Sequence, residues 1–173
     1  MKTVRGIRLS TPDVPGFPDR VQIFNGATGD MLIYDCPRFG TNPNPEGPSN
    51  GPNAGKKWFE FEGQLAPASI PFICSTSPKH GKCLILNPTK NANGAYSGGP
   101  VVTTRPNAAH GGKMIASLVE CHSGYRVVAS GRPWRGSLCC QVIDPDDWTE
   151  FIGHFELNET GVYILVDETA ATV

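Results

Sequence analysis

The sequence predicts an all-β protein with a single domain, folded as a sandwich or as a barrel. Glycine and proline are abundant, with 20 and 16 residues among 173, and this usage is typical of chains with many turns. Short runs of β-branched and aromatic residues lie between the turn residues, which is the pattern of sandwiches and barrels. Strong helix start and stop signals occur at one place, near the C-terminus. The chain is long enough to bury one core.

The first 19 residues predict an extended arm that precedes a β domain of residues 20–173. Prolines recur at every third position of the arm, and proline fixes φ and removes an amide donor. They alternate with apolar side chains in the order Pro12, Val14, Pro15, Phe17 and Pro18. An arm of this kind is suited to lie on a neighbouring subunit.

Two β-hairpins are predicted, one near each end of the β domain. The first pairs Val21–Phe24 with Met31–Tyr34 across the turn Asn25–Asp30, and its strands are rich in β-formers. The second pairs His154–Leu157 with the apolar run Val162–Val166 across an Asn-Glu-Thr-Gly turn. Further short strands are expected at Lys57–Glu62, Pro71–Ser75, Cys83–Leu86, Val101–Thr104, Ile115–Val119, Tyr125–Ala129 and Leu138–Ile143.

Residues 37–57 predict a long loop, because proline, glycine and asparagine dominate this segment. Compact domains rarely keep structureless loops longer than about 15 residues unless the loop is functional or disordered. Ordering such a loop costs about 1–2 kcal/mol per residue, so a partner that contacts it has to offset this cost. The loop is therefore predicted to be a contact surface.

One short helix is predicted near residues 145–152. Asp144 is suited to cap it, Pro145 takes the favoured first position and Gly153 ends it. Its remaining carboxylates, Asp146, Asp147 and Glu150, lack the alternating ligand pattern of a calcium loop. Capping and the helix dipole explain these acids better than metal binding or acid–base catalysis.

Charge and hydropathy exclude several classes of function. The net charge is −1 and the longest basic run is Lys56-Lys57, so nucleic-acid binding is not expected. No apolar segment approaches 18 residues and no signal-peptide core precedes residue 20, so we expect neither a membrane span nor a secretion signal. The chain is then cytoplasmic or part of a virion, with its six cysteines reduced and buried.

The segment GAYSGGPVV, residues 94–102, is similar to the sequence around the nucleophile of trypsin-like serine proteases. The resemblance implies Ser97 as nucleophile, but Tyr96 replaces the family's aspartate, and His80 is the sole histidine upstream. That family needs two complete barrels with histidine and aspartate before the serine. We assign no catalytic residue on this basis.

Cysteine and histidine also supply soft ligands, with Cys74, His80 and Cys83 as a zinc half-site. Structural zinc sites usually use paired ligands two to four residues apart. Cys74 and Cys83 are separated by eight residues, and the adjacent Cys139 and Cys140 would face opposite sides of a strand, so we predict no metal and no cofactor. Cys121 and His122 are considered as a thiol nucleophile with its base, but neighbours in a strand rarely face each other.

The favoured function is that of a structural subunit in a large symmetric assembly, such as a capsid cement, decoration, tail or neck protein of a virion. Its partners are other subunits of the assembly, with homo-oligomers expected. The expected interface residues are Val14, Phe17, Phe39 and Trp58. Two alternatives stay open: a carbohydrate-binding module that uses Trp58, Tyr96, Tyr125 and Trp134, and an enzyme with a Cys/His site.

Overall fold

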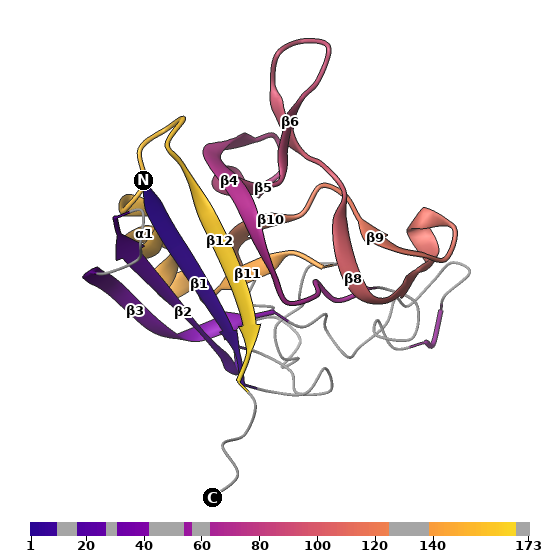
Figure 1. The fold of residues 1–173 in the computed structure, drawn as a ribbon, viewed down its shortest axis with the longest axis horizontal. Coiled ribbons are helices and arrows are strands. Elements are labelled where there is room, and N and C mark those ends of the chain that lie inside the picture. The colour runs from indigo at the N-terminus through magenta and orange to yellow at the C-terminus, as the bar shows by residue number, and fades with distance from the viewer. Residues whose placement is uncertain (10–16, 27–30, 42–53, 57–62, 125–138, 169–173) are drawn as a thin grey trace, which may run out of the picture.

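The computed structural model describes residues 1–9, 17–26, 31–41, 54–56, 63–124 and 139–168. Within these residues, eight strands form a closed barrel of parallel and antiparallel pairs (Figure 1). Around the barrel they are β1 (Lys2–Arg8), β12 (Thr160–Asp167), β4 (Ala68–Ser77), β5 (Gly81–Leu86), β10 (Glu120–Ser123), β11 (Gln141–Ile143), β3 (Met31–Gly40) and β2 (Asp19–Asn25). The expected all-β fold is confirmed, in its barrel form.

The remaining described elements lie outside the barrel wall. Two small hairpins follow β5, namely β6 (Pro88–Lys90) with β7 (Tyr96–Gly98), and β8 (Val101–Asn107) with β9 (Lys113–Ala116). Figure 1 shows both hairpins on the side of the barrel away from β1 to β3. The helix α1 spans Pro145–Gly153. No helix in the described residues has the length and apolar character needed to cross a membrane.

The barrel interior is filled by apolar side chains that alternate along each strand. Val4, Ile23, Phe39 and Tyr163 are fully buried members of this core. Gly6 belongs to the same inward row, because an added Cβ there would meet the hydroxyl of Tyr163. From α1, Phe151 and Ile152 join the core, and the following Phe155 packs edge-on against Phe72.

The prediction of an extended arm is wrong for its first half, because Lys2–Arg8 form one of the eight strands of the barrel wall. β1 pairs with β12 in parallel and with β2 in antiparallel register. The buried Val4, Gly6 and Arg8 alternate with the exposed Arg5 and the half-buried Ile7, which is the pattern of a barrel strand. The proline-rich residues 10–16, which prompted the arm interpretation, lie outside the described residues.

The predicted loop begins too early, because β3 continues through Pro37 to Gly40. The β2–β3 register shifts between the pairs Val21–Cys36 and Asp19–Phe39, so Pro37 lies at an irregularity of the ladder. Proline is tolerated in a sheet at such bulges. Most of the remaining loop, residues 42–53 and 57, lies outside the described residues.

Elsewhere in the chain, some predictions made from local sequence patterns are confirmed and one is wrong. The first hairpin is confirmed as β2–β3, and α1 begins as predicted, with the Asp144 carboxylate accepting the Asp146 amide at 3.0 Å. The second hairpin is wrong, because residues 154–157 form no strand and β12 pairs with β1 and β4 instead. The expected strands at 57–62 and 125–129 lie outside the described residues.

Candidate active site

Glu120 and His122 lie on the outer face of β10, and Cys140 directly precedes β11 and contacts the Glu120 backbone. Between them on the same strands, Cys121 belongs to the interior core and Gln141 accepts a hydrogen bond from the buried Tyr163 hydroxyl. Side chains alternate between the two faces of a strand, so the flanking residues point outward. Cys121 pairs with Gln141 in parallel register, and Cys140 therefore lies beside Glu120 and diagonally from His122.

The thiol of Cys140 is held by backbone groups of the segment before β10. The amide of Glu120 donates to Sγ at 3.4 Å, and Sγ donates to the carbonyl of Leu118 at 3.8 Å. Cys140 is 7% exposed, so the sulfur lies just beneath the surface. A sulfur that accepts a backbone amide has a donor in place for negative charge developing on it.

His122 is fully buried, and its tautomer follows from its hydrogen bond. Nδ1 lies 2.7 Å from the carbonyl of Ser123, and a carbonyl only accepts, so Nδ1 carries the proton and Nε2 is the basic nitrogen. Burial lowers the pKa of His122 to about 4. The ring is therefore neutral near pH 7 and able to accept a proton.

His80 and Glu120 form an ion pair, and the His80 ring of this pair lies over the His122 ring. Nδ1 of His80 lies 2.6 Å from Oε2 of Glu120, and the two side chains are only 8% and 13% exposed. The rings of His80 and His122 are stacked, with centroids 3.7 Å apart and an interplanar angle of 12°. The turn between β4 and β5 thus brings a second histidine to the carboxylate and the histidine of β10.

The other cysteines are poorly suited to act as nucleophiles. All six cysteines are free and buried. Burial raises the pKa of Cys83 and of Cys121, in each case with a further rise from neighbouring charge. For Cys83 that neighbour is Glu120, which also accepts its thiol hydrogen bond. Thiols held protonated in this way are inert, so Cys140 is the better candidate.

Backbone strain concentrates beside Cys140. Four described residues other than glycine have positive φ, and two of them are Leu118 at 60° and Cys139 at 65°. Leu118 supplies the carbonyl next to the Cys140 sulfur, and Cys139 directly precedes it. Positive φ is unfavourable for side chains of this size and recurs at functional sites.

The zinc half-site considered from the sequence is not assembled among the described residues. Cys74 belongs to the interior core, whereas Cys83 packs in the small outer cluster with Ile73 and Ile85. In the part of the chain that the structure describes, no three His, Cys, Asp or Glu side chains form a metal-binding group. His80, which was the third member of this half-site, contacts Glu120 and His122 instead.

The remaining sequence candidates are dispersed. Ser97 lies in β7 opposite Thr89, in a two-stranded sheet separate from the barrel. Phe39 is fully buried, so its side chain belongs to the core of this chain instead of an exposed anchor. Phe17 is partly buried. Val14 and Trp58, like Tyr125 and Trp134, lie outside the described residues.

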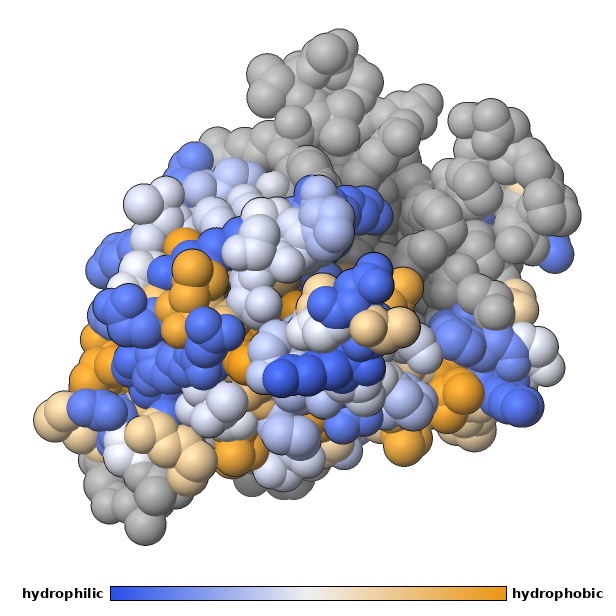
Figure 2. Space-filling model, turned by 90° about the horizontal axis from the view of Figure 1, so that it is seen from above, coloured by the Kyte–Doolittle hydropathy of each residue, from blue (hydrophilic) through white to orange (hydrophobic). Residues whose placement is uncertain are grey.

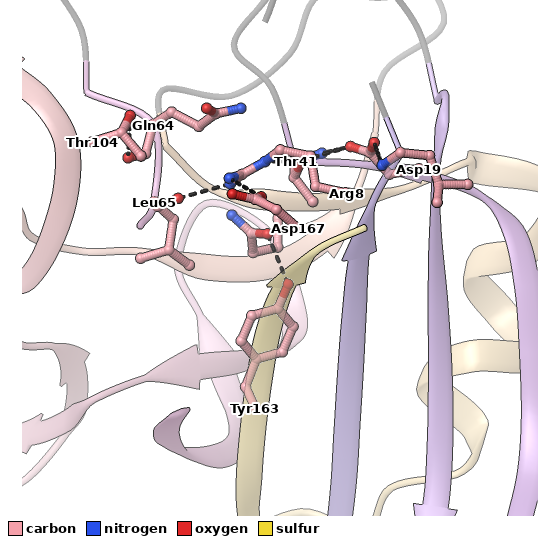
Figure 3. A network of polar contacts seen from close by, with 10 residues as sticks. Arg8, Asp19, Thr41, Gln64, Leu65, Thr104, Tyr163 and Asp167 are labelled. Carbon is pink, nitrogen blue, oxygen red and sulfur yellow. Dashed lines mark hydrogen bonds and ion pairs between the residues drawn. The ribbon is translucent and has the colours of Figure 1, made fainter. Parts of the chain in front are cut away.

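A second polar cluster occupies the end of the barrel at which β1 finishes (Figure 3). Arg8 is 6% exposed, and its guanidinium donates to Thr41 Oγ1 at 3.0 Å, Asp167 Oδ1 at 2.7 Å and the Leu65 carbonyl at 2.7 Å. The buried Asp19 carboxylate accepts from the amides of Leu9 and Thr41, each at 2.9 Å. These contacts tie together separate segments, so the cluster is structural.

Comparison with known proteins assigns no family to the chain, since no family model, curated protein or solved structure matches it. The functional argument therefore depends on the geometry around Cys140. Sequence reasoning considered His80, His122 and the adjacent pair Cys139-Cys140 as metal ligands but passed over Glu120. That reasoning treated the cysteine pair as strand residues, whereas β11 begins at Gln141.

Proposed function

We propose that the chain is an enzyme that uses Cys140 as a nucleophile and His122 as its general base in acyl transfer. The observation that carries the proposal is the contact of the Cys140 sulfur with the backbone amide of Glu120, which is next but one to His122 on β10. The Ser123 carbonyl fixes Nδ1 of His122 as the protonated nitrogen, which leaves Nε2 to accept the thiol proton.

The proposed reaction has two steps. Sulfur attacks the carbonyl carbon of an acyl donor while its proton passes to Nε2, and the leaving amine or alcohol departs with that proton. The resulting thioester is then cleaved by water or by an amine, whose proton passes back through His122 to the sulfur. The neutral resting state of His122 suits a mechanism in which proton transfer accompanies attack.

The test uses p-nitrophenyl acetate as a general acyl donor with the full chain at pH 7. We expect release of p-nitrophenol and an acetyl adduct on Cys140, located by tandem mass spectrometry. Cys140→Ser should abolish the adduct, and His122→Asn should slow its formation by about 100-fold or more. Cys36→Ser is the matched control, because Cys36 is a buried thiol on β3 that binds Asp147, and it should react as the parent does.

Acetylation of Cys140 no faster than that of the interior Cys121 would overturn the proposal. Equal rates in the parent and in His122→Asn would remove His122 from its role. Circular dichroism of each variant shows whether a lost adduct reflects chemistry or unfolding.

We also propose a second function, as a subunit of a symmetric homo-oligomeric assembly such as a virion. The observation in favour is the exposure of large apolar side chains, including Met31 and Leu32 on β3 and Val102 and Met114 on the β8–β9 hairpin, all at least 47% exposed. On the face seen in Figure 2 such residues form separate patches among polar ones, so that face alone does not define an interface.

Light scattering of the native protein tests this second function. A trimer or larger particle would support it, and a monomer of about 19 kDa at micromolar concentration would contradict it. The carbohydrate-binding alternative is weaker, because Tyr96, the described member of its aromatic set, packs against the cluster around Cys83.

A further inference from the structure

His80 and Glu120 face other side chains instead of bulk solvent. They contact each other, and the His80 ring contacts the ring of His122. His80 comes from the turn after β4, yet its ring lies flat on the His122 ring at 3.7 Å. Glu120 is next but one to His122 on the same strand and holds Nδ1 of His80 at 2.6 Å. Both side chains are largely buried, so desolvation strengthens this pair relative to a surface pair.

We propose that His80 and Glu120 are a positioning pair that fixes the His122 ring for proton transfer from Cys140. This inference rests on the proposed acyl-transfer function and adds two residues to it. The Ser123 carbonyl holds one edge of the His122 ring, and the His80 ring covers one of its faces. Together these contacts restrict both the tilt and the rotation of the base.

Glu120 is central to the arrangement because it contacts three parts of the site. Its carboxylate binds His80 and accepts the Cys83 thiol, and its backbone amide donates to the Cys140 sulfur at 3.4 Å. One residue therefore links the turn after β4, the strand β5 and the segment before β11. A shift of Glu120 would misalign the nucleophile and the base together.

The pair also acts on the pKa of His122, after burial, which lowers it most, and the Ser123 carbonyl, which raises it. Interaction with Glu120 raises this pKa, whereas interaction with His80 and with Lys79 lowers it. Cys83 lies on the flanking strand β5, and Cys140 lies directly before β11. Both thiols are neutral. Removing Glu120 or His80 should therefore move the titration of His122 in opposite directions.

The experiment measures the rate of Cys140 acetylation by p-nitrophenyl acetate between pH 3.5 and 8 for the full chain and its variants. Glu120→Ala and His80→Ala should each lower the rate at pH 7 by about tenfold, since a misaligned base transfers its proton poorly. Glu120→Gln should recover most of the loss, because the amide oxygen still accepts from His80. Its acid limb should move to lower pH, and that of His80→Ala to higher pH.

Glu159→Gln is the matched control, because Glu159 is a partly buried carboxylate in an ion pair with Lys2 that the site does not use. It should leave the rate and its pH profile unchanged. Unchanged rates in Glu120→Ala and His80→Ala, with His122→Asn inactive, would overturn the positioning pair and leave the proposed function intact. His80→Ala as inactive as His122→Asn would also overturn it, by making His80 a base. Failure of the parent to acetylate Cys140 would instead overturn the proposed function.

Discussion

The two faces of the β10–β11 pair carry different chemistry although their residues alternate along the same strands. The inner face presents Cys121 to an apolar core and Gln141 to the buried hydroxyl of Tyr163. The outer face presents Glu120, His122 and Cys140. The carboxylate of Glu120 contacts His80, and the amide of Glu120 donates to the Cys140 sulfur. Cys121 and Cys140 thus differ in surroundings, because Cys121 faces packed hydrocarbon whereas Cys140 contacts the Glu120 amide and the Leu118 carbonyl.

The largest effect on stability is expected inside the barrel at β12, where the packing leaves no space for an added methyl group. A Cβ at Gly161 would meet the backbone carbonyl of Lys2 and, at 2.5 Å, the ring of Phe72. Gly161→Ala should lower the free energy of unfolding by about 3 kcal/mol or prevent folding. Gly153→Ala, at the end of α1 where nothing lies within 4 Å, is the control and should stabilise by up to about 1 kcal/mol. Equal stabilities in urea unfolding would contradict the inner packing.

The next effect concerns the outer face and depends on pH. The pKa of His122 is about 4 in the folded chain and about 6.5 when unfolded. The folded state therefore resists protonation, so its stabilising contribution is complete above pH 6.5 and is lost as the pH falls toward 4. This difference corresponds to about 3 kcal/mol.

Urea unfolding at pH 7 and pH 4 measures this dependence. His122→Gln should show a smaller loss of stability between the two pH values, because its side chain does not titrate. The same pH dependence in both proteins would show that His122 is not buried in its neutral form.

A pair of identical substitutions compares the two faces directly. Cys121→Ser places a hydroxyl in the apolar core and should cost about 1–3 kcal/mol. Cys140→Ser keeps polar partners in the Glu120 amide and the Leu118 carbonyl and should cost less than about 1 kcal/mol. Thermal unfolding orders the two variants, and a larger loss in Cys140→Ser would reverse the assignment of faces.

Among the substitutions of inward-facing side chains, the smallest effect is expected at the polar contact between Tyr163 and Gln141. Tyr163→Phe removes the hydroxyl that donates to Gln141 Oε1 at 2.8 Å. The acceptor is then left buried, at a cost of about 1–2 kcal/mol. The double variant Tyr163→Phe with Gln141→Leu should recover part of the loss, and additive losses in a double-mutant cycle would contradict the contact.

How far the sequence predicted this fold depended on the distance between paired segments. The β2–β3 hairpin and the cap of α1 follow from residues a few positions apart, and both predictions are confirmed. The strand β1 was missed because its partner β12 lies more than 150 residues away. The prediction of the second hairpin is wrong for a similar reason, because β12 pairs with β1 and β4 instead of with residues 154–157.

The candidate site was predictable only in its parts. His80 and His122 were recognised as chemically capable residues, but neither has a sequence neighbour that would identify its partner. Their contact requires the β4–β5 turn to lie over β10. Cys140 reaches the site through the parallel register of β11 with β10, and a register of this kind leaves no local signal.

The sequence by itself determined the all-β class, the first hairpin, the helix with its Asp144 cap and the supply of buried thiols. Turn residues, strand alternation and capping act over a few bonds, so their effects can be derived from neighbouring letters. Tertiary structure decided the closure of the barrel, the strand identity of Lys2–Arg8, the contact of Cys140 with Glu120 and the stacking of His80 on His122. These depend on which strands bury each other's apolar faces, and burial is a property of the whole chain.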